Sequence, residues 1–235
     1  MKRIITLLCM MPLLFPICAS GAGTAPASPS GVIRFDFDRD EDFARNWEFY
    51  THNPLLPRTV FRIERRTDSA DGFVLAVNTD ASTGFICTKP KFDLAQYPIM
   101  RWRWRIIRNL NLDEGVTDPD DQSGVVYIGD NRRVRQCFVA YRWECNAPIG
   151  SHLHTRYRSG FTSVRSFCLR NRASRGEEWV VEERNVMEDF ITAFKRPPLN
   201  GFVLCVGANS QHSKSSTRIE IDYIEFLPAP PAPEK

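Results

Sequence analysis

The stretch Met100-Arg101-Trp102-Arg103-Trp104-Arg105-Ile106 is the most regular pattern in the chain. Successive side chains of a β-strand point to opposite faces, so Trp102, Trp104 and Ile106 share one face and the three arginines share the other. A strand with one apolar and one charged face is typical of an antiparallel sheet that packs on a core. Core packing explains these tryptophans better than ligand binding, because large aromatic side chains dominate cores.

Short runs of β-branched and aromatic residues recur on both sides of this stretch, with turn-forming residues between them. Many short strands at this spacing predict an all-β fold, an antiparallel β-sandwich (jelly roll). Residues 187–194 differ, because apolar side chains recur there at i, i+3, i+4 and i+7, which predicts one short helix. The predicted strands are 32–37, 60–64, 73–78, 85–88, 99–107, 125–128, 134–143, 163–169, 179–186, 202–206 and 219–226.

The two ends of the chain differ in composition from the middle. Lys2 and Arg3 precede an apolar run and a group of small residues, which is the pattern of a cleaved export signal. Prolines break that run before it reaches the roughly 20 apolar residues of a membrane span, so we expect no span in the mature chain. We expect a signal peptide (1–22), a linker (23–31), a single β-sandwich domain (32–227) and a Pro-rich tail (228–235), in a periplasmic or extracellular protein.

The composition is that of a globular protein: of 235 residues, 43 % are hydrophobic and 25 % charged. Lys and Arg number 31 against 28 Asp and Glu, and no run of like charge is long enough to follow a phosphate backbone. Nucleic acid is therefore not an expected partner. Arginine supplies 25 of the 31 basic residues, which we interpret as composition bias rather than anion recognition.

The mature chain would keep an odd number of cysteines, so at least one thiol stays free or pairs between chains. Cys137 and Cys145 bracket one predicted strand, whose eight steps of about 3.3 Å hold them about 26 Å apart. They cannot bond to each other at that distance. None of the cysteines has the C-x-x-C spacing of a zinc site. We interpret Cys87, Cys168 and Cys205 as small hydrophobic residues of core strands.

Several short motifs follow one another from about Trp47 to Phe226. They are Asp93-Leu94-Ala95-Gln96-Tyr97-Pro98, then 102–106, then Asp120-Asp121 before a strand carrying Tyr127, then Tyr141-Arg142-Trp143, then 179–194, and finally Asp222-Tyr223-Ile224-Glu225-Phe226. Together they resemble an uncharacterised bacterial family, domain of unknown function 3047. More distantly, the aromatic strand and the closing strand resemble the galactose-binding-like jelly rolls of carbohydrate-binding modules. That second resemblance concerns the fold, and a fold does not fix a function.

The chain departs from this family's pattern at two places. An arginine usually follows the Asp-Asp pair on the next strand, but Val125 stands there. A later loop, usually rich in acidic residues, reads Gly207-Ala208-Asn209-Ser210-Gln211-His212-Ser213 and contains no acid. The resemblance therefore implies an electrostatic site that is incomplete in this chain.

Asp120 and Asp121 raise the question of a catalytic carboxylate pair. Glycoside hydrolysis needs two carboxylates about 5 to 9.5 Å apart across the scissile bond. Neighbours on a strand point to opposite faces, so these two cannot serve one bond. We interpret 118–121 as a turn whose side chains hold backbone amides, with contact to a polar ligand or to calcium as the alternative.

His152 and His154 would share one face of a strand, as metal ligands can, but a third ligand is not evident. Residues 146–160 favour a long loop, since they contain Pro148 and two glycines. We therefore expect neither a metal nor a cofactor. The sequence also contains no glycine-rich phosphate loop, nucleophile elbow or H-E-x-x-H motif.

Two functions from different classes remain. The first is a non-catalytic domain that binds carbohydrate or cell-envelope glycan, without any catalytic residue. The alternative is a polysaccharide-active enzyme, a hydrolase or a lyase, on a jelly-roll scaffold. Sugar recognition uses exposed aromatic platforms, whereas catalysis uses a cleft with carboxylates of perturbed pKa. The candidate ligand-binding residues are Trp47, Tyr50, Asp120, Asp121, Trp143, His152 and Tyr157.

Overall fold

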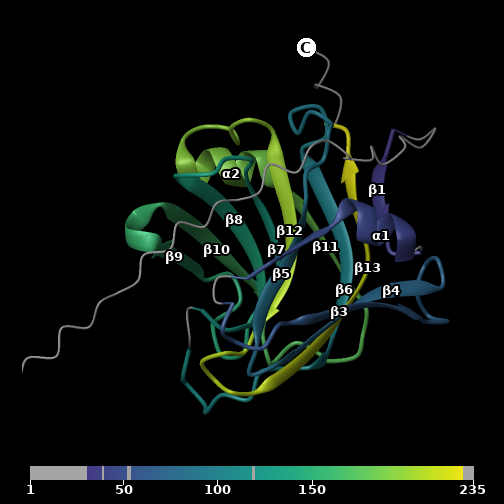
Figure 1. Ribbon diagram of the computed structural model, residues 1–235, viewed down its shortest axis with the longest axis vertical. Helices are drawn as coiled ribbons and strands as arrows, with labels where there is room; N and C mark the ends of the chain where they lie inside the picture. Colours follow the sequence, from purple (N-terminus) through teal and green to yellow (C-terminus); the bar gives the residue numbers. More distant parts are fainter. Residues whose placement is uncertain (1–30, 39, 52–53, 118–119, 230–235) are drawn as a thin grey trace, which may run out of the picture.

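The computed structural model describes residues 31–38, 40–51, 54–117 and 120–229. In this part of the chain, one six-stranded and one seven-stranded sheet enclose a common core (Figure 1). The predicted all-β sandwich is confirmed. The expected signal peptide, nearly all of the expected linker and residues 230–235 of the expected tail lie outside the described residues.

The six-stranded sheet has the order β11-β6-β13-β4-β3, and β1 pairs with the second half of β13. All its pairings are antiparallel. The alternating stretch lies in β6, where Trp102 and Trp104 have no exposed surface and face the core. The strands are β1 (Ile33–Asp36), β3 (Val60–Arg65), β4 (Phe73–Asp80), β6 (Ile99–Arg108), β11 (Val180–Asn185) and β13 (Ser216–Leu227).

The seven-stranded sheet has the order β2-β5-β12-β7-β8-β10-β9. Its strands are β2 (Glu48–Tyr50), β5 (Thr83–Thr88), β7 (Gln122–Asp130), β8 (Gln136–Trp143), β9 (His152–Tyr157), β10 (Thr162–Arg170) and β12 (Phe202–Asn209). Only the β8–β10 pairing in this sheet is parallel, which departs from the expected antiparallel arrangement. After β8 the chain forms β9 at the outer edge of the sheet and then returns as β10, which lies between β8 and β9. β10 therefore runs in the same direction as β8.

This excursion ends where it began. The amide of Glu144 donates to the carbonyl of Arg170 at 2.8 Å, and the amide of Arg172 donates to the carbonyl of Cys145 at 3.0 Å. We call residues 145–171, with β9, β10 and the 3-10 turn Arg158–Gly160, the β9–β10 excursion.

The predicted helix is confirmed as α2 (Val186–Phe194). The Asn185 side chain caps it by accepting a hydrogen bond from the amide of Glu188 at 3.0 Å. The helix α1 (Asp40–Asn46) and the strands β2 and β9 were not predicted. The expectation of a loop over 146–160 was wrong for β9, an edge strand whose side chains are exposed or half-buried without alternation.

The core consists of aromatic and aliphatic side chains from the inner faces of both sheets. Trp102 packs on Tyr141 with ring centroids 5.3 Å apart, and Trp104 packs on Trp143 at 5.4 Å. These contacts join β6 of one sheet to β8 of the other. The aromatic strands therefore hold the two layers together by apolar burial.

The outer face of the six-stranded sheet carries a network of arginines and carboxylates. Its centre is Glu220 on β13, which is only 1 % exposed. Glu220 accepts hydrogen bonds from Arg66 at 2.6 Å, Arg105 at 2.7 Å and Arg218 at 2.9 Å. Burial alone would raise the pKa of Glu220, but these hydrogen bonds hold its pKa below the ordinary value. Arginines that we interpreted as composition bias thus have specific partners on neighbouring strands.

Cys87 of β5 and Cys205 of β12 form a disulfide bond between directly opposed residues. The bond corrects the interpretation of these two cysteines as small hydrophobic residues. The sequence did not reveal the pairing, because cysteine spacing does not show which residues lie opposite each other on neighbouring strands. Cys137, Cys145 and Cys168 are free, which confirms that Cys137 and Cys145 do not bond to each other. Among the described residues, no helix is both long enough and apolar enough to cross a membrane.

Candidate functional site: a cleft on the outer face of the seven-stranded sheet

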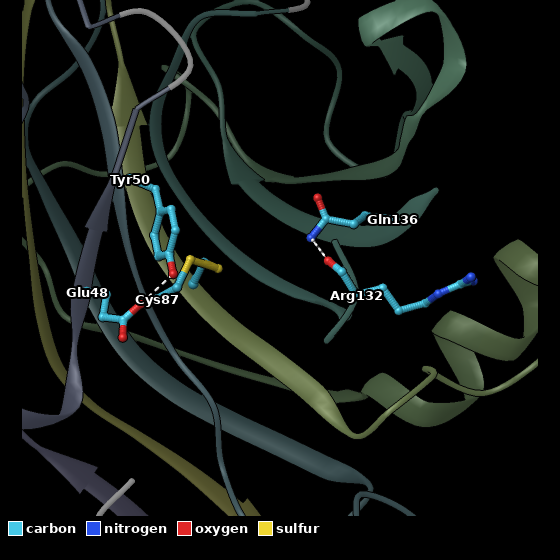
Figure 2. The surroundings of a disulfide bond; sticks show 6 residues. Glu48, Tyr50, Cys87, Arg132 and Gln136 are labelled. Atoms are coloured by element: carbon cyan, nitrogen blue, oxygen red, sulfur yellow. Dashed lines mark hydrogen bonds between the residues drawn. A yellow bond between two sulfur atoms is a disulfide. The ribbon is translucent and has the colours of Figure 1, made fainter. Parts of the chain in front are cut away.

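The outer face of the seven-stranded sheet, which points away from the core, is hollowed into a cleft of about 470 Å³. Each of the seven strands supplies lining side chains, from Tyr50 on β2 to Tyr157 on β9. A volume of this size is typical of ligand pockets. Figure 2 shows one part of this region, with Tyr50 and the disulfide on one side and Gln136 on the other.

Four aromatic side chains, which we call the aromatic row, follow one another across the cleft: Tyr50, Phe85, Tyr127 and Phe138. Tyr50 stacks on Phe85 with centroids 6.1 Å apart and planes at 18°. Phe85 and Tyr127 are 6.1 Å apart, as are Tyr127 and Phe138. A Cβ at Gly129 would lie 2.0 Å from the Phe138 ring, so glycine lets that ring lie against the sheet.

Polar side chains lie at the edge of the aromatic row. The Tyr157 hydroxyl donates to Asp120 Oδ1 at 2.6 Å, and Asn209 Nδ2 donates to the Asp120 carbonyl at 2.7 Å. Burial and the hydrogen bond to Asp120 raise the pKa of Tyr157 well above its ordinary value. This phenol therefore stays protonated at physiological pH.

A β-bulge directs Gln122 into the cleft. Gly207 on β12 opposes Val125 on β7, but Asn209 opposes Gln122, so one strand has an extra residue between these pairs. The extra residue reverses the alternation and puts Gln122 on the same face as Val125. Gln122 Oε1 accepts from Arg142 Nη2 at 2.9 Å, and its Nε2 donates to the Tyr127 hydroxyl at 3.4 Å.

Val125 stands where the family usually has an arginine, and Arg142 is an arginine on the strand beside it. It lies directly opposite Val125 on the neighbouring strand β8, and it forms an ion pair with Glu144 at 2.8 Å. Arg142 on β8 and Glu144 directly after β8 are both buried. The expectation of an incomplete electrostatic site at Val125 stays a prediction. The sequence held the signal: Tyr141 and Trp143 face the core, so Arg142 between them must face outward.

The family model described as "Protein of unknown function (DUF3047)" matches residues 45–225. The chain belongs to the DUF3047 family. No curated protein matches its sequence.

Several solved structures are similar to this DUF3047 chain in backbone path. β-agarase A in complex with oligoagarose aligns with a TM-score of 0.46 and 13 % identity, over 88 % of this chain and 98 % of that one. A second similar structure is the xyloglucanase domain of NopAA, a type three effector from Sinorhizobium fredii, in complex with cellobiose. It aligns with a TM-score of 0.43 and 8 % identity, over 87 % of this chain and 100 % of that one. The mannan-recognising carbohydrate-binding module TmCBM27 aligns with a TM-score of 0.31 and 14 % identity, over 84 % of this chain and 96 % of that one. These likenesses are loose, and they transfer no activity to the DUF3047 chain.

Three of the candidate residues chosen from the sequence line the DUF3047 cleft: Tyr50, Asp120 and Tyr157. Trp47 and Trp143 lie in the core instead, with 9 % and 0 % exposure. Neither indole lines the cleft, so the structure does not bring them together with the other candidates. Burial follows from packing partners that the sequence alone did not identify.

Asp121 and His152 also lie outside the cleft. Asp121 has no exposed surface and accepts hydrogen bonds from the amides of His212 at 3.2 Å and Ser213 at 2.7 Å. Its carboxylate therefore fixes a loop. The ring of His152 packs edge-on against Phe167 with centroids 4.6 Å apart, on the opposite face of the sheet from Tyr157.

The histidines of β9 do share one face, but their ring contacts are with protein groups. His154 Nε2 lies 2.8 Å from the Ser163 hydroxyl. Within the described ranges, no three His, Cys, Asp or Glu side chains gather as a metal site would require.

Proposed function

We propose that this DUF3047 protein is a non-catalytic domain that binds a carbohydrate chain, such as a cell-envelope glycan, in the cleft of the seven-stranded sheet. The observation that carries the proposal is the aromatic row with hydrogen-bonding side chains at its edge, in a cleft of about 470 Å³. Sugars present flat apolar faces and equatorial hydroxyls, so they match ring surfaces bordered by polar groups.

The shape of the cleft favours an extended ligand over a single sugar. Tyr50 on β2 and Tyr157 on β9 lie on the two edge strands of the seven-stranded sheet, and six spacings of about 4.8 Å give a sheet surface of about 29 Å between them. A segment of several sugar units, lying across the strands, fits such a length.

Two observations favour binding over turnover. Asp130, which also lines the cleft, is fully buried and bound by Arg196 through both carboxylate oxygens. Burial raises the pKa of Tyr127 to about 12 and also raises that of Tyr157, so neither phenol is a ready general base at neutral pH. A hydrolase or lyase remains the alternative that the experiment below distinguishes.

The purified mature domain is expected to be retained by at least one of cellulose, xyloglucan, mannan, agarose and peptidoglycan sacculi, without releasing reducing ends. Tyr50→Ala should raise the dissociation constant about fivefold or more, because one stacked ring contributes about 1 kcal/mol to the binding free energy. Phe161→Ala is the matched control, since Phe161 is 52 % exposed and lies outside the cleft.

Retention on none of these glycans, or equal weakening by the two variants, would contradict the proposal. Release of new reducing ends that disappears in Asp120→Asn would establish the enzyme instead.

We also propose that the protein is exported. The basic and apolar start of the sequence and the Cys87–Cys205 disulfide both support this, since disulfides persist mainly in oxidising compartments. A C-terminally tagged protein should be found outside the cytoplasm with about 22 residues removed from its start. Cytosolic protein that retains Met1 would contradict it.

A further inference from the structure

We infer that the Tyr127 hydroxyl is the hydrogen-bond donor that the floor of the cleft offers to a sugar oxygen, and that Gln122 is the positioning residue that turns it outward. This inference rests on the proposed function and deepens it. It predicts a ligand with a neutral acceptor oxygen, a hydroxyl or ring oxygen, above the central strand.

The direction of each hydrogen bond follows from the chemistry of the groups. A guanidinium can only donate, so the Gln122 atom 2.9 Å from Arg142 must be the amide oxygen. The Gln122 amide nitrogen then faces Tyr127, and because that nitrogen can only donate, the phenol oxygen accepts. The single proton of the Tyr127 hydroxyl is left for another acceptor, and none is found among the described residues.

The position of Tyr127 directs that proton to a ligand. Tyr127 lies on β7, the middle strand of the seven, and its cross-strand neighbours are Cys205 and Ala140. Small neighbours leave the phenol at the floor of the cleft, which it lines. Its raised pKa of about 12 keeps it protonated, and therefore a donor, across the physiological range.

The orientation of the Gln122 side chain is fixed by Arg142, which has further partners of its own. Glu144 forms an ion pair with Arg142, and Arg142 also donates to the carbonyl of Asp121 at 2.9 Å. The β-bulge in β7 places Gln122, which is 7 % exposed, between Arg142 and Tyr127. A buried polar chain of this kind holds its members in one arrangement.

Gln122→Glu tests this direction. A carboxylate has only acceptor oxygens at neutral pH, so it would accept from both Arg142 and Tyr127 and turn the phenol proton away from the ligand. We expect affinity for cellohexaose or mannohexaose to fall about five- to tenfold, as for Tyr127→Phe, which is the loss of one neutral hydrogen bond. The double variant should be no weaker than either single variant.

Acidification separates positioning from mere packing. When the carboxylate that Gln122→Glu introduces is protonated, it donates to the phenol again, and affinity should recover, whereas Tyr127→Phe should show no recovery. Equal affinity of wild type and Tyr127→Phe, or no pH-dependent recovery in Gln122→Glu, would overturn the inference.

A measurement without ligand distinguishes this inference from the proposed function. The Raman doublet of Tyr127, taken as wild type minus Tyr127→Phe, reports whether the phenol accepts or donates. It should indicate a phenol that both accepts and donates in the ligand-free wild type, where water takes the proton, and a phenol that only donates in Gln122→Glu. A phenol that only donates in the ligand-free wild type would overturn the inference. The expected Raman change without binding of either hexasaccharide or any glycan above would overturn the proposed function and the ligand role of Tyr127, while the hydrogen-bond direction would stand.

Discussion

Removal of the Cys87–Cys205 disulfide is expected to lower the free energy of unfolding by about 4 kcal/mol. The bond joins residues separated by 118 positions, so it closes a long loop and restricts the unfolded chain strongly. It also joins β5 to β12 beneath the cleft, where both cysteines line the surface. Urea unfolding of a Cys87→Ser/Cys205→Ser variant measures the effect.

Cys168→Ser is the matched control, because Cys168 is a buried thiol on a strand of the same sheet but forms no disulfide. Wild type in the presence of a reducing agent should unfold like the double variant. An unfolding midpoint of the double variant that equals that of the wild type would show that the bond does not form in solution.

Glu220→Gln is expected to cost about 3 kcal/mol of stability. The carboxylate is buried beneath three guanidinium groups, and removing one partner of a buried ion pair leaves the opposite charges uncompensated. The control is Glu178→Gln, since the Arg175–Glu178 pair is 84 % and 61 % exposed and should contribute at most about 0.5 kcal/mol. Chemical denaturation at neutral pH measures both variants.

The pH dependence of this effect has a definite sign. The pKa of Glu220 is lower in the folded protein than in the unfolded chain, so its stabilisation is fully present above about pH 5 and is lost as the pH falls through the lowered pKa. The difference between wild type and Glu220→Gln should therefore shrink on acidification. A difference that stays constant down to about pH 2 would contradict the role assigned to the charge.

Much of the fold could be predicted because its signals are local. The alternation in β6 and the apolar period of α2 each specify an element from neighbouring residues. The strand β9 escaped prediction because it lies at an edge, where neither face has to be apolar. The parallel pairing of β8 with β10 was equally hidden, since it depends on the path of the chain.

The candidate site was less accessible to sequence reasoning than the fold. Tyr50, Asp120 and Tyr157 were selected as aromatic or polar residues on exposed loops, and all three line the cleft. Whether an aromatic residue faces the core or the cleft depends on the register of its strand. Gln122 could not be assigned a face, because a bulge reverses the alternation just before it. Arg142 was within reach, since it alternates with two core aromatic residues.

The β9–β10 excursion has a consequence for how members of this family can differ from one another. Its ends meet beside Glu144 and Arg170, so the segment can be lengthened, shortened or exchanged while the rest of the framework stays in place. Yet it carries Tyr157, one wall of the cleft. The shape and chemistry of this cleft wall can therefore diversify by insertion and deletion in a single peripheral segment, separately from the residues that stabilise the fold.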